Sequence, residues 1–140
     1  MTAPRDLFPV TQATIDEAYD FIFAPWVKQL GLKDFQVQTG RVAATLPELD
    51  ALKFSAGAVC GQAIMAAIDT VASLAVATGE RPTRGTAYQH TQFLRPAKGD
   101  DFSVEANVLR FGKSTAYVEV HVLYAQSREL VAHAVLEFAF

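Results

Sequence analysis

Asp69 is the side chain whose surroundings most need a chemical explanation. It lies within Gly57 to Gly79, where nearly every residue is small or apolar and the only other ionisable group is Cys60. An ionised carboxylate that is buried without partners is strongly destabilising, so a carboxylate in such a place usually has a partner or a chemical task. We therefore treat Asp69 as the first candidate for a catalytic group.

The stretch around Asp69 is typical of a long central helix, and its polar residues define one face. At about 100° per residue, Gln62, Asp69 and Ser73 fall within about 40° of one another, whereas the other faces are apolar. Such a stripe is typical either of a catalytic face or of a side that meets a partner subunit. Alanine and polar residues dominate the stretch, so we expect a helix wrapped by protein rather than one that spans a membrane.

One further helix and one strand are predicted before the central helix. Residues 14–17, Thr-Ile-Asp-Glu, have the pattern of a capping box, which predicts a first helix there. Pro25 is expected to break this helix or to open a short helical piece that ends at Gly31. Residues 35–46 alternate in polarity as a strand does, and their change of phase near Gly40 indicates a bulge or bend.

Four strands and no further helix are predicted after the central helix. The alternating runs lie at 86–94, 102–108, 116–124 and 130–140, and turn-forming residues separate them. Antiparallel strands with one polar face need a layer packed against the other face, and the central helix supplies it. We expect one α+β domain over residues 1–140, with an antiparallel sheet wrapped around the long helix and an extra N-terminal helix.

Composition narrows the classes of partner and compartment. The chain has 140 residues, of which 51% are hydrophobic, and its formal net charge is -3. This charge gives no broad cationic surface, so nucleic acid is not an expected partner. One cysteine excludes an intrachain disulfide and any Cys-based zinc site. The first ten residues lack the charged-then-apolar pattern of a leader, so we expect a cytoplasmic protein.

The three histidines are weighed in the same way. No two of them have a spacing along the chain that is typical of a metal pair, so we expect no metal site. His121 and His133 fall on the polar phases of their strands, and we expect them on an exposed sheet face. His90 shares a strand phase with Thr86 and Tyr88 in this alternation, which makes it a candidate contact to substrate.

Three segments, taken in order, match the motifs of one family. Residues 60–70, CGQAIMAAIDT, resemble the His-Gly-Gly-to-Asp helix of hotdog-fold acyl-CoA thioesterases of the phenylacetate-pathway (PaaI-like) kind. Residues 86–99, TAYQHTQFLRPAKG, look like that family's strand running into a Phe-Leu-Arg-Pro turn, and residues 130–135 resemble its closing strand. The resemblance covers residues 20–140 and implies a single hotdog domain.

The resemblance also implies a mechanism for thioester hydrolysis. The backbone N–H of Gly61 would bind the thioester carbonyl, where a helix start favours a developing oxyanion. Asp69 would act as general base on water or attack the carbonyl directly, and Thr86 matches a Ser/Thr that helps to hold the water or the acid. In this family the site lies between subunits, so a homodimer is the minimum unit and a homotetramer is common. Coenzyme A enters as part of the substrate, and no cofactor is expected.

Two residues depart from the family pattern. Cys60 stands where the family usually has His, and Gln62 stands where it usually has a second Gly. The amide of Gln62 would either block a substrate carbonyl or bind it. A thiol near a helix start suggests a nucleophile, but no base lies near Cys60 in sequence, so we expect a small buried residue. Together with Ser73, both are candidate substrate contacts.

The functional prediction is hydrolysis of an acyl-CoA thioester whose acyl group is aryl or of short or medium length. Arg95 and Lys113, at turn positions, are the first candidates to meet the phosphates of coenzyme A. The alternative is a hotdog protein that binds acyl-CoA or an aromatic ligand without catalysis. A hotdog dehydratase or hydratase usually carries a catalytic His, and the Cys at position 60 counts against that class.

Overall fold

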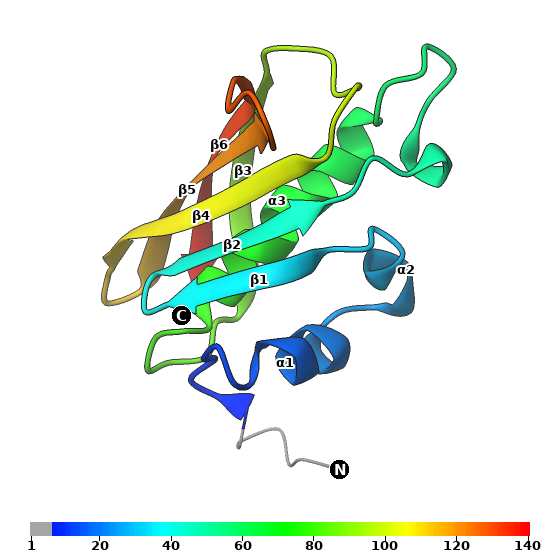
Figure 1. Cartoon of the computed structure of the whole chain (residues 1–140). Coiled ribbons are helices and arrows are strands. Elements are labelled where there is room, and N and C mark those ends of the chain that lie inside the picture. Colours follow the sequence, from blue (N-terminus) through cyan, green and yellow to red (C-terminus); the bar gives the residue numbers. More distant parts are fainter. Residues whose placement is uncertain (1–6) are drawn as a thin grey trace.

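Six strands form one antiparallel sheet, and a long helix lies against one face of it (Figure 1). This computed structural model describes residues 7–140, so the expectation about the first ten residues falls mostly outside the described part. The helices are α1 (Ile15–Ile22), α2 (Pro25–Lys28) and α3 (Gly61–Val76), with a short 3-10 turn at Asp50–Leu52. The strands are β1 (Lys33–Gln38), β2 (Arg41–Leu46), β3 (Gly85–Phe93), β4 (Phe102–Phe111), β5 (Thr115–Tyr124) and β6 (Leu130–Ala139).

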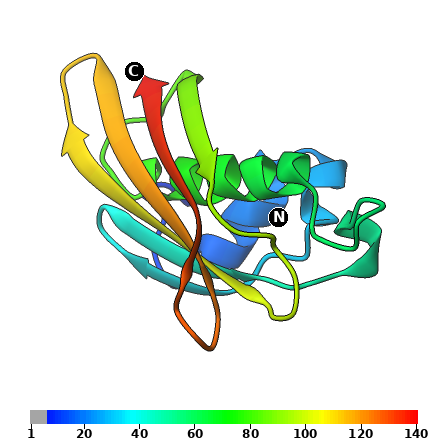
Figure 2. The same cartoon turned by 90° about the horizontal axis from the view of Figure 1, so that it is seen from above.

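The sheet has the order β1-β2-β4-β5-β6-β3, and every neighbouring pair is antiparallel. It curves around α3, which lies in the hollow, as Figure 2 shows. Buried and partly exposed side chains alternate along most of β2, β4, β5 and β6, because one face packs on α3 and the other is open. The expected wrapping of an antiparallel sheet around a central helix is confirmed.

The contact between α3 and the sheet forms the centre of the core. The large side chains of α3 that face the sheet are fully buried: Ile64, Ile68, Val71 and Leu74. Between them lie buried alanines such as Ala67 and Ala75, whose small side chains allow the helix to approach the strands closely. Among the described residues, no helix is long and apolar enough to cross a membrane.

The helix itself is shorter than the apolar stretch that predicts it. It begins at Gly61, because the preceding backbone is already bonded elsewhere: Val59 N–H donates to Ala97 O and Cys60 N–H donates to Leu52 O, both at 2.8 Å. Its polar stripe is confirmed, since Gln62, Asp69 and Ser73 all lie on the side that is not buried. The apolar stretch from Gly57 thus extends beyond the helix, whose start at Gly61 is the one that the family resemblance implies, and the face carrying Asp69 is as predicted.

The capping box predicted at the start of α1 does not form. The Thr14 hydroxyl accepts a hydrogen bond from Thr11 N–H (3.0 Å) and donates to Leu7 O (3.3 Å), and so it is not bonded to the first turn of the helix. Pro25 opens α2, which is the second of the two predicted alternatives. Gly31, with φ of 73°, follows that helix and allows the chain to turn away.

The single strand predicted over residues 35–46 is in fact two strands. β1 and β2 pair antiparallel, with Gln38 opposite Arg41, and only Thr39 and Gly40 connect them. Gly40 has φ of 77°, in the left-handed region that a tight two-residue hairpin requires. The change of phase in the sequence thus marks a reversal of the chain, and the predicted bulge or bend at this point is wrong.

This hairpin gives a stability prediction. A Cβ at Gly40 would meet only ordinary contacts, the nearest being Phe111 Cε2 at 3.7 Å, so a substitution there acts through the backbone. Gly40→Val should lower the free energy of unfolding by about 1–2 kcal/mol, because a β-branched residue resists positive φ. Gly40→Asn is the matched control and should cost less, since Asn enters the left-handed region more readily. Urea denaturation measures both, and a Val variant as stable as wild type would contradict the hairpin.

Candidate active site

A hydrogen bond joins Asp69 on α3 to Thr86 near the beginning of β3. The Thr86 hydroxyl donates a hydrogen bond to Asp69 Oδ1 at 2.5 Å. Asp69 is on the polar stripe of α3, and Thr86 is the second residue of the edge strand. The structure therefore brings together two of the residues that the sequence nominates, and the second carboxylate oxygen of Asp69 remains available to a substrate or water.

The surroundings of Asp69 change its affinity for a proton. Partial burial removes water from the carboxylate and raises its pKa above the ordinary value of 3.8, and the hydrogen bond from Thr86 acts in the opposite direction without cancelling that effect. A carboxylate with a raised pKa is a stronger base than an exposed one. This is a suitable setting for proton abstraction.

Gly61 occupies the first helical position of α3, where backbone donors are unpaired. No acceptor among the described residues takes the N–H of Gly61 or Gln62, as is usual in the first turn of a helix. The ring of Phe93 covers this position, and a Cβ on Gly61 would lie 3.3 Å from its Cζ. The site can therefore present two N–H groups and the positive end of the helix dipole to an oxyanion.

Gly61 and Asp69 of one chain do not form a single site. They are eight residues apart on a continuous helix, which places them about 12 Å apart along its axis. A carbonyl group that reacts with a base or nucleophile must lie within about 3–3.5 Å of its partners. The donor and the carboxylate of one chain thus belong to separate locations, at the two ends of the polar stripe.

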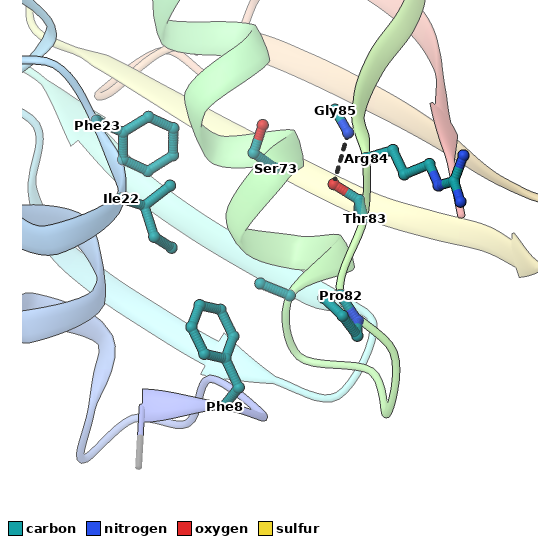
Figure 3. Close-up of a pocket in the computed structure, with 9 residues that line it drawn as sticks. Phe8, Ile22, Phe23, Ser73, Pro82, Thr83, Arg84 and Gly85 are labelled. Atoms are coloured by element: carbon teal, nitrogen blue, oxygen red, sulfur yellow. Dashed lines mark hydrogen bonds between the residues drawn. The ribbon is translucent and has the colours of Figure 1, made fainter. Parts of the chain in front are cut away.

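A pocket of about 370 Å³ lies beside the carboxylate end of this stripe (Figure 3). Phe8, Ile22 and Phe23 form one wall, and the segment from Pro82 to Gly85 forms the opposite one. Ser73, one turn beyond Asp69, lies between them and donates a hydrogen bond to Asp69 O at 2.7 Å. The size of this pocket and the mostly apolar side chains that line it suit a small organic group.

A second hollow, of about 220 Å³, lies at the start of α3. It is lined by Trp26, Gln29, Leu30, Leu52, Cys60, Gln62 and Ala63. Cys60 and Gln62 therefore lie together, whereas Ser73 is eleven residues further along the helix, about 16 Å from Gln62. The candidate substrate contacts on α3 form two groups within one chain. Cys60 is half-buried, so the expectation that it is a buried residue is only partly met.

Comparison with known proteins places this arrangement in a family. The sequence profile of the thioesterase superfamily matches residues 56–131, more than half of the chain, and the match includes Gly61, Asp69 and Thr86. The chain belongs to the thioesterase superfamily. The expected family is confirmed. No curated protein is similar enough to count as a match.

Solved structures confirm the hotdog fold of this superfamily member. The zebrafish thioesterase superfamily member 2 superposes with a TM-score of 0.84 at 18% identity, covering 93% of this chain and 98% of its own. The PaaI protein from the phenylacetic acid degradation operon of Escherichia coli gives a TM-score of 0.78 at 19% identity, covering 91% and 94%. The protein smu.793 of Streptococcus mutans, solved with acetyl-CoA, gives 0.69 at 24% identity, covering 77% and 90%.

His90 lies on the other face of the sheet, away from Asp69. Thr86 is paired with Phe138 and Tyr88 with Glu137, so the register shifts between them and one extra residue changes the phase of β3. Beyond that bulge, His90 is paired with Val135, whose side chain lies on the face opposite α3. The prediction that His90 shares a phase with Thr86 is wrong, because alternation in the sequence does not reveal the bulge.

Arg95 and Lys113 lie at opposite ends of the sheet. Arg95 Nε is 3.0 Å from Glu129 Oε2, and Arg95 Nη1 donates to Leu130 O at 2.6 Å, at the turn between β5 and β6. Lys113 is in the turn between β4 and β5, and the ten residues of β5 separate the two ends by about 30 Å. One chain cannot direct both side chains at one phosphate group, so each remains a separate prediction.

The structure also reveals a pair that spacing along the chain does not show. His121 and His133 face each other across β5 and β6, with ring centroids 5.1 Å apart. The lack of a metal-pair spacing along the chain therefore does not keep these two histidines apart, since strand pairing brings them together. Both lie on the face opposite α3, as predicted, but they are half-buried there rather than exposed. The strand pairing of 116–124 with 130–140 is the signal that could have found them.

The hydrogen bond between Thr86 and Asp69 leads to a testable prediction about the pKa of Asp69. Because burial raises the pKa of Asp69 and the Thr86 hydrogen bond lowers it, Thr86→Val should raise that pKa further. Thr86→Ser keeps the hydroxyl and should leave the pKa near the wild-type value. NMR titration of the Asp69 carboxyl group measures both. Thr91→Val, a change on the same strand away from Asp69, should have no effect, and an unchanged pKa in Thr86→Val would contradict the assignment.

Proposed function

We propose that the protein hydrolyses acyl-CoA thioesters, with Asp69 as the general base. The observation that carries this proposal is the half-buried carboxylate of raised pKa, held at one oxygen by Thr86 in a member of the thioesterase superfamily. Asp69 would take a proton from water as the water oxygen attacks the thioester carbonyl. The carbon–sulfur bond then breaks, the proton held by Asp69 passes to the departing sulfur, and coenzyme A leaves as its thiol. The reaction uses water and these groups and takes no cofactor.

The oxyanion in this proposal is bound by the first turn of α3. The N–H of Gly61 points from the helix start and has no acceptor among the described residues, so it is free to donate to the carbonyl oxygen. Gln62 follows it and adds a second N–H and a side-chain amide at the same place. Of the two alternatives for Gln62, we favour binding of the carbonyl, since its exposed side chain can turn an amide N–H toward the carbonyl oxygen.

Because Gly61 and Asp69 of one chain are about 12 Å apart, the proposed mechanism needs a second chain. Support comes from the two edges of the sheet, which differ. The Gln12 side chain bonds both Phe35 O and Val37 N–H at 2.8 Å and so covers the β1 edge. The β3 edge has no strand beside it in the described chain, and Phe93 on this strand is 51% exposed. A long exposed edge strand is normally paired or covered.

A two-fold axis through the middle of β3 would complete the site. Gln89 is the central residue of β3, and its Nε2 donates to the carbonyl of Met65 at 3.3 Å. Met65 is midway between Gly61 and Asp69 on α3. An axis at this point pairs β3 with its copy and sets the two α3 helices antiparallel, which places Gly61 of one chain near Asp69 of the other. We therefore propose a homodimer with two shared sites, which can associate further into a tetramer.

The acyl group would enter the pocket beside Ser73. Its volume of about 370 Å³ and its wall of Phe8, Ile22 and Phe23 suit an aryl group or a short to medium acyl chain. Support for coenzyme A as the other half of the substrate comes from smu.793, which has this fold and was solved with acetyl-CoA bound.

The first experiment replaces the proposed base. Asp69→Asn keeps the size of the side chain and can still bond Thr86, so the variant should fold and assemble as wild type does. Its kcat on acyl-CoA should fall by about 100-fold or more, because a neutral amide cannot take the proton. Benzoyl, phenylacetyl and straight-chain acyl-CoAs form the substrate panel. Retained turnover would reject Asp69 as the base, and binding without turnover by wild type would favour the non-catalytic alternative.

The second experiment tests whether the site is shared. Gly61→Pro removes the proposed N–H donor at a helix position where proline is tolerated, and Gly61→Ala is its control, since it adds a Cβ but keeps the N–H. A heterodimer of one Gly61→Pro chain and one Asp69→Asn chain should recover about half of wild-type activity, because one of its two sites is intact. Differently tagged chains allow its purification. If both sites lay within single chains, this heterodimer would be inactive.

A further inference from the structure

Three potential metal ligands lie together on the face of the sheet that points away from α3. His121 on β5 is paired directly with His133 on β6, so both side chains point to the same side. Glu119 is two residues before His121 on β5 and therefore shares that side. The thioesterase chemistry proposed above uses none of them, since it lies on the α3 side of the sheet.

The distances between these groups are close to those between the ligand atoms of a metal site. His133 Nε2 and Glu119 Oε2 are 2.9 Å apart, and one ligand atom from each of the three residues lies within 4.8 Å of the others. Ligand atoms around a tetrahedral ion with bonds of about 2.0–2.1 Å lie about 3.4 Å apart. Small side-chain rotations are enough to close the remaining difference, and the strand pairing holds all three backbones in place.

The cluster is open to solvent, and the Glu119 carboxylate in it is accessible to an ion. The side chains of His133 and Glu119 are 29% and 34% exposed, so an ion can reach them. Glu105, paired with His121 on β4, is already bound at its Oε2 by Arg128 (2.6 Å) and Ser103 (2.8 Å). Burial acts to raise the pKa of Glu105, but these hydrogen bonds and the nearby arginines outweigh it and lower the pKa. Glu119 is thus the carboxylate that remains for an ion.

Two imidazoles and one carboxylate are a donor set that Zn²⁺ prefers, and they leave a fourth position for water. From this geometry we propose that Glu119, His121 and His133 bind one Zn²⁺ ion per chain on the outer face of the sheet. The ion would bridge β5 and β6 from the side opposite α3. This inference does not depend on the proposed hydrolysis, because it rests on a separate cluster.

Calorimetric titration of metal-free, tag-free protein with Zn²⁺ tests this proposal. Wild type should bind one ion per chain, and its melting temperature should rise with Zn²⁺ concentration. His121→Gln and His133→Gln should each weaken binding by about tenfold or more, and the double variant should show none. Titration with Co²⁺ adds a direct readout, since the visible absorption of bound Co²⁺ reports a four-coordinate site.

His90→Gln is the matched control, because His90 is the one remaining histidine and lies on the same face outside the cluster. This variant should bind Zn²⁺ as wild type does. The proposal would be overturned by wild type that takes up no Zn²⁺, by a His133→Gln variant with unchanged affinity, or by an equal loss in His90→Gln. Thermal melts of each variant without metal establish that it is folded.

Discussion

The burial of one face of α3 in the curved sheet is the constraint on which the rest of the structure depends. Ile64, Ile68, Val71 and Leu74 turn completely into the core, so the rotation of the helix about its own axis is determined. The opposite stripe, which carries Asp69, must then face away from the main body of the sheet. At Asp69 the stripe is met by the edge strand β3, through the hydrogen bond from Thr86, and the carboxylate is half-buried.

The site follows from the way in which β3 runs antiparallel to α3. Phe93 lies over Gly61, Gln89 bonds the carbonyl of Met65, and Thr86 bonds Asp69. These three positions along α3 therefore each contact a residue of β3. The Gly61 N–H and the Asp69 carboxylate are about two helical turns apart. A two-fold axis between them would bring the Gly61 N–H of one chain close to the Asp69 carboxylate of a second chain. In the proposed mechanism, catalysis and association would thus use the same surface.

Much of the fold and part of the site could be predicted from sequence. The apolar run with a lone Asp69 predicted the central helix and its polar face, and the alternating runs after it predicted four strands. Errors arose where a single residue changes the phase of the chain. Gly40 reverses the chain instead of bending it, and the extra residue between Thr86 and Tyr88 moves His90 to the other face.

The sequence by itself determined the helix, its stripe and the family, because helical periodicity and motif order are properties of neighbouring residues along one chain. Only the tertiary structure decided which distant residues meet. The bond between Thr86 and Asp69 and the pairing of His121 with His133 both depend on the register of strands. Register is determined by long-range hydrogen bonds and by single-residue bulges, and the alternation of polar and apolar residues along a strand does not specify it.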